Sequence, residues 1–329
     1  MSTTPPALRG VAAWCGLVLA LYVVVPWLFA GNLYLMSMIV AAMTIGGVAL
    51  AWALLGNLGG LVSFGHAAFF GVGSYASAIL VMKHGWPVAP AMLAGGMCAA
   101  LSAVLMLPAL RLRGPYFALA VLAYAHIFRI VATEWTALTG GAGGIGNIAR
   151  LPVVLGYDFS SKTGAYWVVL SLVVIFALVY RSIRDSDFGL ALRAIRGSED
   201  ATRAAGVNSV LLKASMLFLS AFMTGVIGAF NAHYINFLEP DYAFSGQWTM
   251  LPIVAAIFGG YRTITGPLLG ALVIYLADQL LFKEVMPIGH QMVLGVLLGA
   301  MIVLAPRGLL PLFDGIGARG VRARPQADA

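Results

Sequence analysis

Long runs of apolar residues alternate with short polar links along nearly the whole chain. Ten apolar segments stand out, at 11–30 and at about 33–55, 67–82, 88–110, 115–133, 165–180, 214–236, 247–260, 266–282 and 288–305. A helix needs roughly 20 apolar residues to cross a bilayer, and it satisfies its own backbone hydrogen bonds there. The pattern therefore predicts an all-α polytopic membrane protein with about ten transmembrane helices.

The composition agrees with a membrane protein. The chain is 61% hydrophobic and 9% charged, whereas a soluble domain has about 25% charged residues. Its 39 glycines suit close helix packing in lipid. The two cysteines, Cys15 and Cys98, both lie in apolar segments, where we expect small buried side chains and neither a disulfide framework nor a metal centre.

The basic residues are distributed unevenly between alternate links. With the N-terminus in the cytoplasm, 14 of the 19 Lys and Arg residues fall on the cytoplasmic side, four fall outside and Arg129 lies within a segment. The positive-inside rule therefore predicts that both termini are cytoplasmic. It makes 134–164 a periplasmic loop and 315–329 a basic, disordered tail. Residues 1–329 form a single predicted transmembrane domain, and the net charge of +7 reflects membrane orientation rather than a nucleic-acid partner.

One link is unusually rich in charge. Residues 181–213, the charged loop, hold ten of the 31 charged residues, six of them basic and four acidic. Such a loop between hydrophobic segments is a place where a soluble partner can grip a membrane protein. The alternative is a loop that is merely solvated.

The segment 56–66 is uncharged and rich in glycine. It predicts a break between two helices at membrane depth, where irregular backbone must be covered by protein or water. The polar residues Asn57, Ser63, His66 and Ser74 are candidates for a translocation path. The alternative for His66 is a cap on a re-entrant helix.

Two ionisable residues lie within the segment 115–133. His126 and Arg129 are three positions apart, and ionisable groups in a span are candidates for function. We include both in the candidate translocation path. The structural alternative is that Arg129, close to the outer boundary, reaches the interface or pairs with Glu134.

Other chemistry finds little support in the sequence. Residues 141–146 match G-x-G-x-x-G, but the expected strand before them and the acidic residue about 20 positions later are missing, so a dinucleotide site is excluded. The sequence has no catalytic triad and no metal-ligand spacing. We therefore expect no enzyme activity, no bound cofactor and no ATP site in this chain.

Several segments resemble LivM-type branched-chain amino acid permeases. The sequence NLGGLVSFGHAAFFGVGSY at 57–75 is similar to the family's signature, and RLRGPYFALA at 111–120 is similar to a second one. Further similar segments follow in the family's order at 135–145, 188–206, 259–271 and 305–309. The chain departs from the family at His126, where members often have Glu, and 200–206 is only a loose version of the broader importer loop.

The resemblance implies one of two membrane subunits of an ABC importer for branched-chain amino acids in the bacterial inner membrane. The implied partners are a second, homologous permease, two cytoplasmic ATPases that use the ATP, and a periplasmic binding protein. A short helix around 199–213 would sit in an ATPase groove. The residues that the resemblance assigns to this ATPase-coupling loop are Arg193, Arg196, Glu199, Asp200, Ala201, Arg203, Ala204, Ala205 and Gly206.

Three alternatives remain at this point. The same permease architecture serves urea or another amino acid in related proteins. A secondary transporter or channel would need membrane-embedded coupling groups and would work alone. An integral membrane enzyme would need a catalytic cluster near an interface.

Overall fold

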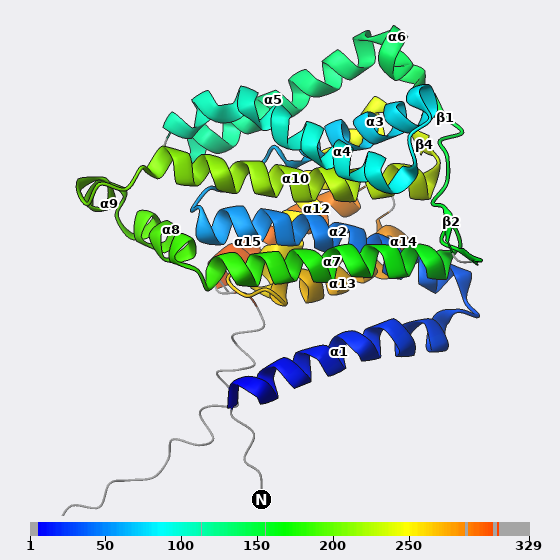
Figure 1. Ribbon diagram of the computed structural model, residues 1–329, viewed down its shortest axis with the longest axis horizontal. Helices are drawn as coiled ribbons and strands as arrows, with labels where there is room; N and C mark the ends of the chain where they lie inside the picture. Colours follow the sequence, from blue (N-terminus) through cyan, green and yellow to red (C-terminus); the bar gives the residue numbers. More distant parts are fainter. Residues whose placement is uncertain (1–5, 113, 155, 287–288, 305–307, 309–329) are drawn as a thin grey trace, which may run out of the picture.

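The computed structural model describes residues 6–112, 114–154, 156–286, 289–304 and 308, and helices dominate it (Figure 1). The helices that follow the apolar segments are α1 Pro6–Phe29, α2 Leu33–Leu58, α3 His66–His84, α4 Val88–Ser102, α5 Pro115–Glu134, α7 Lys162–Arg184, α10 Ser209–Ile235, α12 Gln247–Gly259, α13 Gly266–Ala277 and α15 His290–Leu304. Each of the ten predicted segments thus contains a helix. The predicted tail, 315–329, lies outside the described residues.

Five of the described helical stretches are long and apolar enough to cross a membrane. They are Leu33–Leu58, Val88–Arg111, Pro115–Glu134, Lys162–Arg184 and Ser209–Ile235. The second of these joins α4 to the 3-10 helix η1, Ala103–Arg111. Helix α12 has only 13 residues, and α13 has 12 before a π-helical stretch, η3 Asp278–Phe282, and α14 Lys283–Val285 continue it. The number of ten crossing helices stays a prediction.

Helix α2 is the centre of the bundle. It packs against α7, α10, α12 and α13, and 83% of its most apolar window is buried. This explains its lack of a polar face, because a helix that is covered on all sides is apolar all round. Helix α1 runs apart from the bundle in Figure 1 and meets α7 through Tyr166, whose hydroxyl donates to the carbonyl of Leu21 across 3.0 Å.

Helices α3, α4 and α10 form a second closely packed group. Glycines let their backbones approach: a Cβ on Gly225 of α10 would lie 3.1 Å from Gly96 Cα and 3.3 Å from the carbonyl oxygen of Gly95, both in α4. On the α3 side, a Cβ on Gly73 would overlap the backbone of Gly225. Small residues at such contacts are how helices associate in lipid, where the hydrophobic effect between them is weak.

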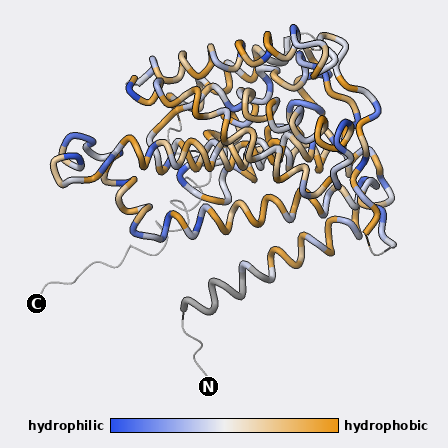
Figure 2. Tube along the Cα trace, turned by 45° about the horizontal axis from the view of Figure 1, so that its top comes forward, coloured by the Kyte–Doolittle hydropathy of each residue, from blue (hydrophilic) through white to orange (hydrophobic). Residues whose placement is uncertain are grey.

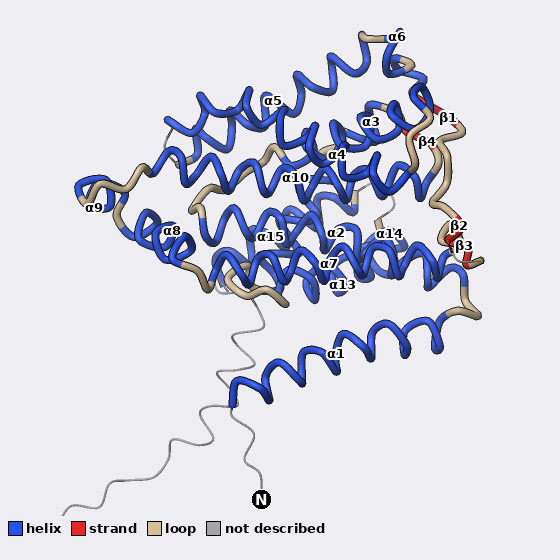
Figure 3. Tube along the Cα trace, viewed as in Figure 1, coloured by secondary structure: helices blue, strands red, loops and turns tan. Residues whose placement is uncertain are grey.

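Irregular structure collects at the two ends of the bundle (Figure 3). The charged loop, with α8 Asp187–Gly197 and α9 Glu199–Ala204, lies at one end, and 134–164 lies at the other. The elements at this second end are α6 Thr136–Thr139, η2 Gly141–Gly143, β1 Ile145–Gly146, β2 Val153–Val154, β3 Tyr157–Asp158, β4 Phe237–Leu238 and α11 Pro240–Ala243. Strand β1 pairs antiparallel with β4, and β2 pairs with β3. Hydrophilic positions are concentrated at both ends (Figure 2), as helix ends outside a bilayer require.

The glycine-rich segment separates α2 from α3. Residues 59–65 are not helical. Gly59, Leu61, Ser63 and Gly65 are buried in the bundle, whereas Gly60 and Val62 are exposed. Buried Trp52 donates from Nε1 to the carbonyl of Ser63 across 2.8 Å. A Cβ on Gly65 would lie 2.8 Å from the carbonyl oxygen of Val121 in α5. The buried part of the break is therefore packed against α2 and α5, and its position at membrane depth stays a prediction.

Candidate functional site

The charged loop is built from two short, well-capped helices. Ser186 accepts a hydrogen bond from the Gly189 amide at the start of α8, and Ser198 accepts one from the Ala201 amide at the start of α9, both across 3.3 Å. Serine at this position satisfies an amide that lacks a helical partner. The acidic residues Asp187 and Glu199 occupy the first turns, where the helix dipole favours a negative charge. The local sequence thus defines both helix starts.

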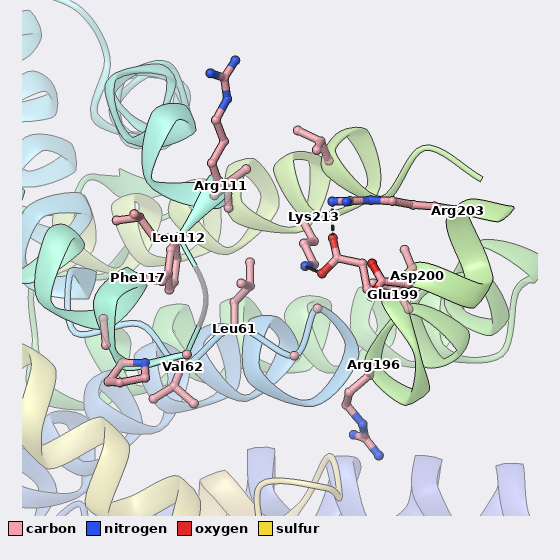
Figure 4. A pocket seen from close by; sticks show the side chains of 18 of the residues that line it. Leu61, Val62, Arg111, Leu112, Phe117, Arg196, Glu199, Asp200, Arg203 and Lys213 are labelled. Carbon is pink, nitrogen blue, oxygen red and sulfur yellow. Dashed lines mark hydrogen bonds and ion pairs between the residues drawn. The ribbon is translucent and has the colours of Figure 1, made fainter. Parts of the chain in front are cut away.

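Glu199 holds α9 against the first turns of α10. Its carboxylate accepts hydrogen bonds from Arg203 Nη2 and Lys213 Nζ, both at 2.7 Å (Figure 4). It also accepts one from Ser209 Oγ at 2.9 Å. Partial burial by itself raises the pKa of Glu199, but the hydrogen bonds from Lys213 and Ser209 outweigh it and keep the pKa below its ordinary value. The carboxylate is therefore charged near neutral pH and shapes the loop from within.

The helix expected around 199–213 is interrupted in the structure. Helix α9 ends at Ala204, and α10 starts at Ser209. Gly206 has a φ of +85°, a left-handed conformation that turns the chain, and Asn208 then caps α10 by accepting from the Leu211 amide across 3.1 Å. The predicted single helix is thus wrong in extent, because the glycine turn and the new cap divide it.

The small residues of this turn face outward. Ala201, Ala204, Ala205 and Gly206 are all exposed, and a Cβ on Gly206 would meet no atom within 4 Å. They present a smooth tip with little side-chain entropy to lose on contact. Between them and α10, Thr202 is buried and donates to the carbonyl of Ser198 across 2.8 Å.

Arg196 connects the charged loop to the glycine-rich break. Its Nη1 donates to the carbonyl oxygen of Asn57 across 2.7 Å and to Asn57 Oδ1 across 2.9 Å. Asn57 in turn donates from Nδ2 to the Tyr180 hydroxyl at 2.8 Å and to the carbonyl of Arg262 at 3.3 Å. One asparagine side chain therefore joins α2 and α7 to the loop and to the link after α12.

A cavity of about 920 Å³ lies between the charged loop, the break and the link into α5 (Figure 4). Its charged lining residues are Arg111, Arg196, Glu199, Asp200, Arg203 and Lys213. Four of these six are cations. In Figure 4, Arg196 points away from Glu199, so the two residues anchor opposite sides of the loop. We call this space the loop cavity.

The side chain of Arg193, another basic residue predicted for the coupling loop, reaches back to the end of α7. Arg193 donates from Nη1 to the carbonyl of Arg184 across 2.7 Å, which caps the end of α7. The loop is thus tied to α7, α2 and α10 through Arg193, Arg196 and Glu199 respectively.

The six residues predicted for a translocation path lie in three separate places. Asn57 belongs to the Arg196 cluster described above. Ser63, His66 and Ser74 are fully buried, and none of the three lines the loop cavity. His66 Nε2 shares a hydrogen bond of 2.9 Å with Ser220 Oγ of α10.

The other two path candidates lie on the outer face of α5. His126 is exposed, and Arg129 pairs with Asp241 of α11 across 3.0 Å. Glu134 was one alternative that the sequence offered for Arg129, and the structure instead supplies a partner 112 positions away in the chain. The side chain of Asp241 is 81% exposed, so this ion pair is worth about 1 kcal/mol at most.

Sequence reasoning missed the partners that hold these residues. Tyr180, Ser209 and Ser220 were not singled out, although each hydrogen-bonds a predicted residue. A hydroxyl inside an apolar run was the available signal. This signal indicates that a polar group is buried and needs a hydrogen-bond partner, but it does not indicate which helix supplies that partner.

The fold defines a multi-pass membrane protein, and the charged loop lies at one end of its helical bundle. The family model of the branched-chain amino acid transport system permease component matches residues 34–306. The chain therefore belongs to this family of LivM-type permeases.

Individual relatives agree with the family match. The high-affinity branched-chain amino acid transport system permease proteins LivM of Salmonella typhimurium and Escherichia coli are each 30% identical over 285 residues. These alignments cover 78% of this chain and 65% of each relative's length. The LivH permease of Escherichia coli is 22% identical over 84% of this chain and 96% of its own length. No solved structure matches the chain.

Proposed function

We propose that this chain is a membrane-spanning permease subunit of a bacterial ABC importer. It carries the branched-chain amino acids leucine, isoleucine and valine across the inner membrane, and separate ATPase subunits supply the energy. Both termini and the charged loop face the cytoplasm, and 134–164 faces the periplasm. The partners are a second, homologous permease, two ATPases and a periplasmic binding protein.

The observation that carries this proposal is the construction of the charged loop. An exposed tip of small residues is held on three sides by Arg193, Arg196 and Glu199. A soluble ATPase that grips the tip would move α8 and α9 as one piece. Through Arg196, that motion would reach Asn57 at the end of the central helix.

The family likeness supports the substrate class. The LivM and LivH relatives are permease proteins of branched-chain amino acid transport systems. A ribose import permease of Haemophilus influenzae also matches, at 24% identity over 40% of this chain. The substrate therefore needs its own test.

The first test is purification of the tagged chain from its native membrane in mild detergent, followed by mass spectrometry and an ATPase assay. We expect ATPase subunits to co-purify, and leucine-loaded binding protein to stimulate hydrolysis. Stimulation by urea or another solute instead would retain the mechanism and change the substrate. A chain that purifies alone and transports solute in liposomes would refute the proposal and indicate a secondary transporter.

A further inference from the structure

A second cavity, of about 380 Å³, lies at the end of the bundle opposite the charged loop. Residues of α2, α10, α12, α13 with its extension, and α15 line it. None of the residues predicted for the translocation path is among them. We call this space the Asp278 cavity.

One wall of the cavity carries both signs of charge. Asp278 is only 2% exposed. Gln279 donates a hydrogen bond from Nε2 to Oδ2 of Asp278 across 3.5 Å. Lys283 donates from Nζ to Oε1 of Gln279 across 3.1 Å. The amide thus bridges a carboxylate and an ammonium group on the same wall. Ionisable groups among apolar helices are costly and tend to serve a substrate or an ion.

The backbone at this wall is itself unusual. Residues Asp278–Phe282 form a π-helical stretch between α13 and α14. Short π-helical insertions are rare and occur often at functional sites. Here Asp278 and Gln279 of this stretch and Lys283 just after it all line the cavity.

Another part of the cavity lining is mainly aromatic and aliphatic, and it is firmly held. Trp248 of α12 stacks on Phe70 with ring centroids 3.8 Å apart, and its Nε1 donates to the carbonyl of Tyr242 across 3.0 Å. The Tyr242 hydroxyl donates to Asn231 Oδ1 of α10 across 2.9 Å. Leu251 of α12 completes this side. The wall is therefore organised before any ligand arrives, which lowers the cost of binding.

We propose that the Asp278 cavity binds an α-amino acid with an apolar side chain as a zwitterion. The ligand's ammonium group contacts Asp278, its carboxylate contacts Lys283, and its side chain packs against Trp248 and Leu251. The volume lies in the range of about 300–1,000 Å³ that is typical of small-molecule sites. The inference rests on the proposed function and adds a solute site within the permease itself. Urea or a neutral sugar would satisfy neither charge.

The test uses the full-length chain with its co-purifying subunits in lipid nanodiscs, without ATP or binding protein. We expect saturable binding of radiolabelled leucine. Asp278→Asn and Lys283→Gln should each weaken it about 10- to 100-fold, the range for a lost hydrogen bond between charged groups. Glu284→Gln is the matched control, because Glu284 is exposed and does not line the cavity. Its leucine affinity should equal that of the parent chain.

Two analogues of leucine, each lacking one charged group, test which residue binds which group of the ligand. Leucinol lacks the carboxylate, so Lys283→Gln should not weaken its binding. The analogue 4-methylpentanoate lacks the ammonium group, so Asp278→Asn should not weaken its binding. Equal weakening of all three ligands by either variant would overturn the proposal. If a variant fails to fold, the parent chain still decides, because it should bind leucine at least about tenfold more tightly than either analogue.

The ATPase assay separates this proposal from the proposed function. If leucine-loaded binding protein stimulates hydrolysis but the nanodisc-embedded complex binds no leucine, the cavity proposal is wrong and the transporter assignment stands. If no ATPase co-purifies but leucine binds with the expected variant pattern, the cavity proposal stands and the ABC assignment is wrong.

Discussion

Arg196 and Asn57 are joined by two hydrogen bonds from one guanidinium nitrogen, at 2.7 Å to the backbone oxygen and 2.9 Å to the side-chain oxygen of Asn57. The two residues are 139 positions apart. Their contact makes the end of α2, the most enclosed helix, a direct neighbour of the charged loop. A displacement of α8 therefore cannot leave the central helix unaffected unless this contact breaks.

Arg196→Ala should separate ATP hydrolysis from uptake. Hydrogen bonds to a charged group contribute about 1.5–3 kcal/mol each, and a tenfold effect corresponds to about 1.4 kcal/mol. We expect leucine uptake in proteoliposomes of the full complex to fall at least about tenfold while the ATPases still co-purify. Arg181→Ala is the control, because it removes the same charge from the loop and breaks only an exposed ion pair with Asp185 at 3.8 Å. Equal losses in both variants would mean that loop charge, rather than the Asn57 contact, matters.

Gly206 should tolerate asparagine better than alanine. Its φ of +85° costs a residue with a Cβ roughly 1–2 kcal/mol, and asparagine adopts this region more readily than alanine. Because no atom lies within 4 Å of the added Cβ, the effect comes from backbone strain alone. Co-purification of the ATPases should therefore decrease in the order glycine, asparagine, alanine. Gly197→Ala, also open to solvent but without a positive φ, should change it little.

Gly206→Trp tests the docking face rather than the turn. Its bulk would stand at the exposed tip of small residues, so ATPase binding should fall further than in Gly206→Ala. Equal binding by the tryptophan and alanine variants would show that no partner sits closely on the tip.

The charged loop should loosen only in acid. Because the folded pKa of Glu199 lies below its ordinary value, its contribution to stability is present above the unfolded pKa of about 4.3 and is lost as the pH falls through the folded pKa. A spin label on Ala204→Cys, in a chain lacking Cys15 and Cys98, should keep constant mobility between about pH 8 and pH 5. In the Glu199→Gln variant, the spin label should be more mobile than in the parent chain over this whole pH range. A transition in the parent chain near pH 7 would contradict this interpretation.

Gly225→Val should destabilise the whole bundle. The valine side chain would press against α4, whose Gly96 Cα is 3.1 Å from the first added atom. Overpacking of a dense core costs about 1–3 kcal/mol. We expect a lower melting temperature in detergent, measured by the loss of monodisperse protein. A Cβ added to Gly299 in α15 would meet no atom within 4 Å, so Gly299→Val should have the melting temperature of the parent chain. A similar decrease in this variant would mean that replacing any glycine destabilises the protein, whatever its packing.

The helices could be predicted from the sequence because apolar runs of membrane length leave few alternatives. The break at 59–65 could be located in the same way, since a glycine-rich, uncharged segment interrupts the helical pattern. The end of α9 was harder to predict. Alanine-rich sequence at 201–205 favours a continuing helix, whereas the left-handed turn at Gly206 and the cap at Asn208 end it.

The candidate site was likewise only partly predictable from the sequence. The sequence marked Glu199 and Arg196 as residues of the charged loop, but it gave no indication that they bind α10 and α2. Asp278 and Lys283 are only five positions apart in the chain. Only the folded chain brings Trp248 and Asn231 to the cavity that these two residues line.

The sequence by itself determined the helical segments, the charged loop and the family, because these depend on local hydropathy and on the order of short motifs. The tertiary structure decided that Arg196 contacts Asn57, that Arg129 pairs with Asp241 and that Asp278 and Trp248 line the same cavity. Such relationships join residues far apart in the chain, and they depend on how helices rotate and pack against one another. Apolar helices with little polar face carry almost no record of that rotation in their sequence, because the side that faces lipid is as apolar as the side that faces other helices.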